Sequence, residues 1–183
     1  MRLKAANDIA PEEIESVRIG VPRTGWTIVG DPEEAKQNPK SVVDGQFSMP
    51  FCAAVALRAG GLAWDDYARH LGDPKTLDLC KRVRTEVDEA AEAEFPKNLA
   101  GGARIITARG VFEDFVAAPL GEPENFVSSD QLRAKFDGLV GPYLPPGQVD
   151  ALAAALLAID TADDIGAVLR LSRPAGPVAA LAG

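Results

Sequence analysis

The chain has 183 residues, of which 46% are hydrophobic and 25% are charged, the usual composition of a globular domain. Its 27 acidic and 19 basic residues give a formal net charge of −8, which argues against nucleic acid or an anionic membrane surface as a partner. The sequence contains no run of 18 apolar residues and no signal-type apolar stretch after Met1, so a cytoplasmic protein is expected.

The sequence predicts one strand followed by a long connection in the first quarter of the chain. A helical turn is expected over residues 11–15, and a strand over 16–22, where apolar and other residues alternate. Residues 23–41 contain several glycines and prolines and are expected to form a connection, in which 26–29 are interpreted as a second strand. Long connections in compact domains are often functional.

The segment from Pro39 to Gly61 is the most informative part of the sequence. Ser48 can cap a helix, Pro50 suits the first helical turn, and the glycines at the end of the segment supply a stop. Between these signals the residues 51–57 have no polar face. A helix that is apolar all round belongs in a protein interior, so the residues just before it are expected to form the rigid edge of a binding pocket.

Further helices and a hairpin are expected after this segment. A short helix begins near Trp64, and the pair Asp73-Pro74 opens a longer helix that continues as far as Glu94. Residues 103–108 and 111–118 predict two antiparallel strands. The helix at 74–94 is inferred from four apolar residues at helical spacing, namely Leu79, Cys80, Val83 and Val87.

The last third of the chain is predicted to be helical. Ser128 or Ser129 caps one helix, and two more are expected over 149–159 and 163–171. Their content of alanine and leucine requires a packing partner. Residues 172–183 are expected to form a frayed tail.

Three blocks in the same order resemble the C-terminal domain of the MmgE/PrpD family. Residues 44–51, Asp-Gly-Gln-Phe-Ser-Met-Pro-Phe, are similar to a family motif that reads roughly Asp-Ala-x-Phe-Ser-hydrophobe-Pro-Tyr. Residues 9–17 resemble the lead into the first strand. Residues 121–125, Gly-Glu-Pro-Glu-Asn, precede a helix with Lys135-Phe136 and are similar to a later family pattern.

This resemblance implies an α+β domain, built as a two-layer arrangement of a small, largely antiparallel sheet with helices. Whole family members have a large helical N-terminal domain before this region, so residues 1–183 are expected to be a single C-terminal domain without it. The C-terminal helices would then pack toward the helical domain. The resemblance also implies homodimers.

The function implied by the resemblance is that of a metal-independent lyase of the 2-methylcitrate dehydratase type, an enzyme class of propionate metabolism. Its substrates would be small di- or tricarboxylates, and no cofactor is expected. Because the family's principal acid-base residues lie largely in the helical domain, no catalytic residue is assigned to this chain, which is expected to be inactive alone. The alternatives are a non-catalytic binding or interaction module, and the same fold with decarboxylase or epimerase chemistry.

Four residues are candidates for contacts with a carboxylate substrate: Lys40, Gln46, Ser48 and Phe51. Three of them have a structural alternative: Ser48 as a helix cap, Gln46 as an exposed loop residue and Phe51 as core. Phe51 stands where many family members have tyrosine, so a phenol that could donate a proton is missing there. Gly45 stands in place of the usual alanine.

Metal binding and hydrolase chemistry are disfavoured by residue counts. One histidine and two distant cysteines cannot supply a typical zinc or iron-sulfur ligand set. His70 ends a short helix and is expected to interact with the helix dipole. Cys52 and Cys80 lie in apolar helical patterns and are expected to be buried, unpaired thiols.

Overall fold

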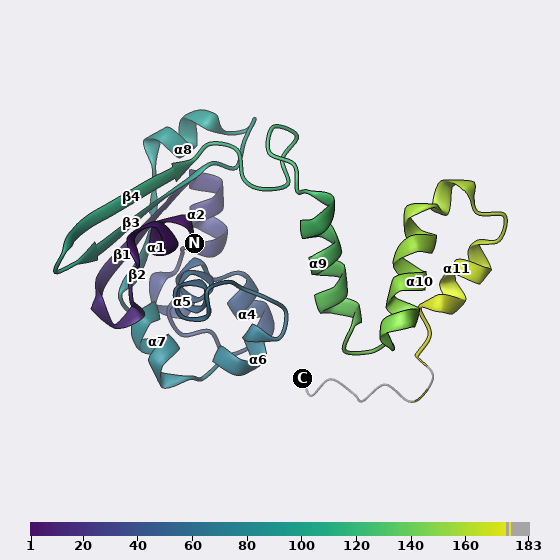
Figure 1. Cartoon of the computed structure of the whole chain (residues 1–183). Helices are drawn as coiled ribbons and strands as arrows, with labels where there is room; N and C mark the ends of the chain where they lie inside the picture. Colours follow the sequence, from purple (N-terminus) through teal and green to yellow (C-terminus); the bar gives the residue numbers. More distant parts are fainter. Residues whose placement is uncertain (175, 177–183) are drawn as a thin grey trace. The chain divides into compact units, whose positions relative to one another are not determined.

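The computed structural model describes residues 1–174 and 176, which form two compact units (Figure 1). The first unit runs from Met1 to Asn125, and the second begins at Phe126. The predicted frayed tail falls mainly on residues 175 and 177–183, which lie outside the described residues.

The first unit is built on a four-stranded sheet of order β2-β1-β3-β4. The strand β1 pairs in parallel with β2 and antiparallel with β3, and β3 pairs antiparallel with β4. This architecture confirms the α+β prediction with a largely antiparallel sheet. The strand bounds are β1 Ile14–Val21, β2 Val83–Val87, β3 Gly101–Thr107 and β4 Gly110–Val116.

Eight α-helices and one short 3₁₀ helix accompany this sheet within the described part of the first unit. The helices α5 and α7 pack against each other, and α5 also contacts β2 (Figure 1). The bounds are α1 Arg2–Asn7, η1 Pro11–Glu13, α2 Arg23–Val29, α3 Glu33–Lys36, α4 Val42–Gln46, α5 Met49–Ala59, α6 Asp66–His70, α7 Pro74–Cys80 and α8 Glu89–Glu94.

The helix α5 is the centre of the first unit's hydrophobic core. Ser48 caps its N-terminus, and Gly60 ends it with a left-handed backbone at φ 84°, a conformation that glycine adopts without strain. Its apolar side chains pack with those of the sheet and of α7, which confirms the predicted buried helix. The buried members of this core are Ile9, Ile14, Val17, Phe51, Ala54, Val55, Leu57, Leu79, Cys80, Val83 and Ile105.

Two predicted elements are wrong. Residues 26–29 belong to helix α2 rather than to a strand, because Trp26 lies over β2 and its indole N–H donates to the carbonyl of Thr85 at 3.1 Å. The helix expected from Pro74 to Glu94 ends at Cys80 and is followed by β2 and by α8. The four apolar residues do have helical spacing, but Val83 and Val87 lie on the same face of the strand β2, which pairs with β1.

The second unit contains α9 Ser129–Val140, α10 Pro146–Leu157, η2 Ile159–Thr161 and α11 Ile165–Leu171. Ser128 and Gln131 form a reciprocal capping box at the start of α9, which resolves the choice between two serines. Leu144, Val149 and Leu152 form its small core. Among the described residues no helix is both long and apolar enough to cross a membrane.

Candidate functional site

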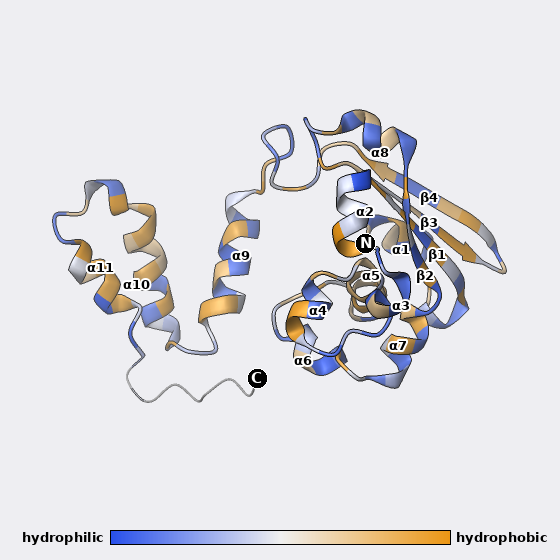
Figure 2. Ribbon diagram, turned by 180° about the vertical axis from the view of Figure 1, so that it is seen from behind, coloured by the Kyte–Doolittle hydropathy of each residue, from blue (hydrophilic) through white to orange (hydrophobic). Residues whose placement is uncertain are grey.

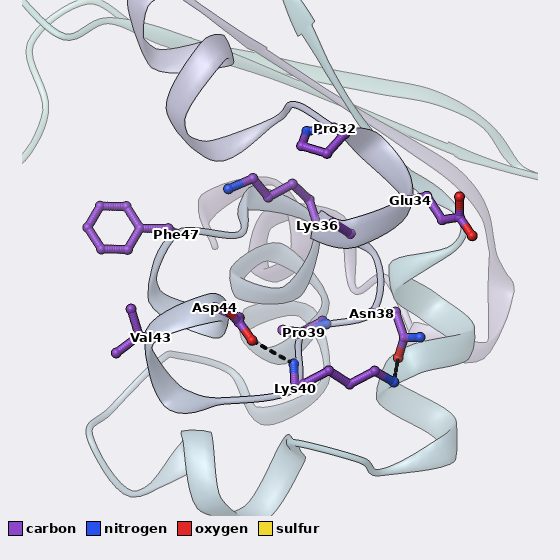
Figure 3. Close-up of a pocket in the computed structure, with 10 residues that line it drawn as sticks. Pro32, Glu34, Lys36, Asn38, Pro39, Lys40, Val43, Asp44 and Phe47 are labelled. Carbon is purple, nitrogen blue, oxygen red and sulfur yellow. Dashed lines mark hydrogen bonds between the residues drawn. The ribbon is translucent and has the colours of Figure 1, made fainter.

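A hollow of about 580 Å³ lies beside the start of α5 (Figure 3). It is formed by α3, the loop after it and α4, so it belongs entirely to the first unit. We call it the α3–α4 hollow. Its lining residues are Pro32, Glu34, Ala35, Lys36, Asn38, Pro39, Lys40, Val43, Asp44 and Phe47.

Two lysines border this hollow. The ammonium group of Lys36 donates to the carbonyl oxygen of Ile28 at 2.7 Å, and that of Lys40 donates to the amide oxygen of Asn38 at 2.8 Å. Neither forms an ion pair with a carboxylate among residues 1–174 and 176. Both acceptors are neutral, and the charge of Lys36 also acts on the carboxylate of Asp44 in the same lining. An anionic ligand could add a charge-assisted hydrogen bond to either lysine.

The carboxylate of Asp44 is already occupied by the local backbone. It accepts hydrogen bonds from the N–H groups of Lys40 at 3.1 Å and Ser41 at 3.0 Å, while the hydroxyl of Ser41 caps α4 through the N–H of Asp44. The hydrogen bond from the Lys40 backbone, followed by those from Ser41, lowers the pKa of Asp44 below its usual value. Asp44 therefore holds the loop around Lys40 in place, and its carboxylate already has hydrogen-bond donors within the chain.

The apolar wall of the hollow is formed by Val43 of α4 and by Phe47, the C-cap residue of this helix. Val43 is 61% exposed and Phe47 is 50% exposed, and both side chains project from the same side of α4 (Figure 3). Figure 2 shows hydrophobic residues in the ribbon of α4. A ligand in this hollow would meet lysine ammonium groups and an apolar wall, together with the carboxylates of Glu34 and Asp44.

The four predicted site residues lie in different environments. Lys40 lines the hollow, whereas Gln46 is exposed and is not among the lining residues. Ser48 and Phe51 are fully buried. The hydroxyl of Ser48 accepts a hydrogen bond from the N–H of Phe51 and donates one to the carbonyl oxygen of Lys36. Ser48 thus supports the wall of the hollow from within.

Phe51, the last residue of the motif, is part of the hydrophobic core. Its ring stacks on that of Tyr67 with centroids 6.0 Å apart and an interplanar angle of 26°. A Cβ atom added at Gly45 would lie 3.1 Å from a ring carbon of each aromatic residue, closer than most real contacts. The glycine in place of the usual alanine therefore accommodates these two rings.

Lys36 and Phe47 belong to the hollow but were not among the predicted site residues. Lys36 was missed because the sequence of α3 reads as part of a connection and does not reveal that Ser48 binds its carbonyl. Phe47 could have been predicted as a site residue, because it belongs to the motif of residues 44–51. A large apolar residue just before a helix cap is a usable signal for a pocket wall.

The single histidine of the sequence lies outside the hollow, in a polar cluster between α6 and α7. The Nδ1 atom of His70 is 2.8 Å from the hydroxyl of Thr76, which in turn donates to the carboxylate of Asp73 at 2.8 Å. Arg58 also contacts Asp73 and Thr76. Nδ1 of His70 also lies 3.4 Å from Nη1 of Arg58. His70 is therefore held by a structural network.

No group of three or more histidine, cysteine or acidic side chains suited to holding a metal ion is found in the described part of the chain. Both cysteines there are unpaired. Cys80 is buried and Cys52 is half-buried, with its thiol directed to the carbonyl of Gly45 at 3.3 Å. Neither thiol lines the α3–α4 hollow.

The fold and the hollow together define an α+β domain with a partly apolar, lysine-bordered recess next to a buried helix. Comparison with known families matches residues 1–161 to the MmgE/PrpD C-terminal domain, and the chain belongs to this family. The match confirms the resemblance carried by the three sequence blocks. A comparison with curated proteins found no match.

Proposed function

We propose that this chain supplies one wall of the substrate cleft of a metal-independent lyase that acts on small di- or tricarboxylates, of the 2-methylcitrate dehydratase type. A helical domain of the family would form the opposite wall and carry most of the acid-base residues. The enzyme would act in the cytoplasm, as a homodimer. Membership of the MmgE/PrpD family supports this proposal.

The observation that carries the proposal is that the ammonium groups of Lys36 and Lys40 have only neutral hydrogen-bond acceptors. Two ammonium groups bound only to neutral oxygens border one hollow, although the whole chain is strongly acidic. A carboxylate ligand could replace or join these neutral acceptors with charge-assisted hydrogen bonds. Abstraction of a proton next to a carboxylate builds negative charge on that group, which a nearby ammonium stabilises.

The apolar wall fits the same class of ligand. Val43 and Phe47 would contact the hydrocarbon part of a small acid while the lysines contact its carboxylates. Closure by a second domain would remove water from the hollow and strengthen both interactions. The chain alone is therefore expected to bind such acids weakly and to catalyse nothing.

The test measures binding and turnover of 2-methylcitrate, citrate and cis-aconitate, first with the chain alone and then with the helical domain of a family member added in trans. Turnover is expected only in the mixture. Lys36→Gln is expected to weaken binding about tenfold, the loss of one charge-assisted contact. Lys135→Gln, which removes a lysine of α9 in the second unit, is the matched control. Equal binding by all three proteins would contradict the assignment of the hollow.

A non-catalytic binding module is the second candidate, and Phe51 favours it. The family motif often has tyrosine at this position, and here the ring has no hydroxyl and is fully buried. A module would bind carboxylates through the same lysines but would show no turnover in a mixture whose complex formation has been demonstrated. Decarboxylation or epimerisation would be recognised from the products formed in the same assay.

A further inference from the structure

We draw no further inference here: the strongest candidate, the row of three arginines that lies on one face of the sheet, with Arg84 of β2 and Arg104 of β3 on either side of Arg18 of β1, carries nothing, because each guanidinium is already paired with a carboxylate of the same chain, that of Glu33, Glu113 or Glu86.

Discussion

Ser48 hydrogen-bonds to the backbone at two points that are far apart along the chain. Its hydroxyl accepts a hydrogen bond from the N–H of Phe51 at 3.0 Å and donates to the carbonyl of Lys36, twelve residues earlier. One side chain therefore both caps α5 and holds the end of α3 against it. The position of Lys36 at the α3–α4 hollow depends on this contact.

Ser48→Ala is expected to lower both stability and ligand binding. The free energy of unfolding should fall by about 1–2 kcal/mol for the lost cap, and by a further ~1 kcal/mol for the carbonyl of Lys36 left without its donor. Urea denaturation measures this change. Ser41→Ala, which removes the cap of the exposed helix α4, is the control and should cost less. Equal losses in both variants would contradict the role given to the Lys36 contact.

Gly45→Ala is expected to destabilise the protein although alanine is the usual residue of the family motif. The new methyl group would lie 3.1 Å from ring carbons of Phe51 and Tyr67, and crowding of this kind typically costs about 1–3 kcal/mol. Gly61→Ala is the matched control, since a Cβ there meets nothing within 4 Å. A thermal melt that shows no difference between the two variants would count against a tight Gly45 site.

The parts of the fold that were predicted correctly have local causes. Ser48, Pro50 and Gly60 determine α5 through its two ends, and Ser128 does the same for the start of α9. The hairpin of β3 and β4 was recognised from a turn next to Gly110, with bounds displaced by only one or two residues. Such signals act within a few residues and can be read from a single sequence.

The parts that were missed depend on contacts between distant residues. The strand β2 pairs with β1 across more than sixty positions of sequence, and its two apolar valines fit a helix equally well when the partner is unknown. The helix α2 contains Trp26, Thr27, Ile28 and Val29, which favour a strand locally, but packing on β2 decides their conformation. Lys36 was missed in the same way, because its position at the hollow depends on the contact of its carbonyl with the distant Ser48.

Both cysteines are expected to react slowly in the native protein. Burial raises the pKa of the Cys80 thiol to about 12, and burial also raises that of Cys52, so little reactive thiolate forms near neutral pH. A disulfide reagent at pH 8 should modify neither residue quickly, and both should react in denaturant. Fast modification of Cys80 before unfolding would show that α7 opens readily. Cys80→Ala, which leaves Cys52 as the single thiol, assigns the rates.

Acid should weaken the cluster around Asp73. Burial raises the pKa of Asp73, but hydrogen bonds from Thr76 and the neighbouring Arg58 outweigh it, and the net shift is downward. A carboxyl group whose pKa is lower in the folded state stabilises the protein above its unfolded pKa, and this contribution disappears as the pH falls through the folded value. Asp73→Asn should therefore be less stable than the unmodified protein at pH 7, and the difference should shrink progressively below about pH 4.

The measurement for Asp73 is urea denaturation at a series of pH values. Asp78→Asn is the control, because Asp78 lies on the same helix and its ion pair with Arg82 involves a side chain that is 70% exposed. Exposed pairs contribute little, so the control should follow the unmodified protein at every pH. A constant difference between Asp73→Asn and the unmodified protein from pH 7 to pH 3 would show that the carboxylate charge is not what Arg58 and Thr76 stabilise. The loss would then come from helix capping alone, since the N–H of Thr76 donates to Asp73 at 2.9 Å.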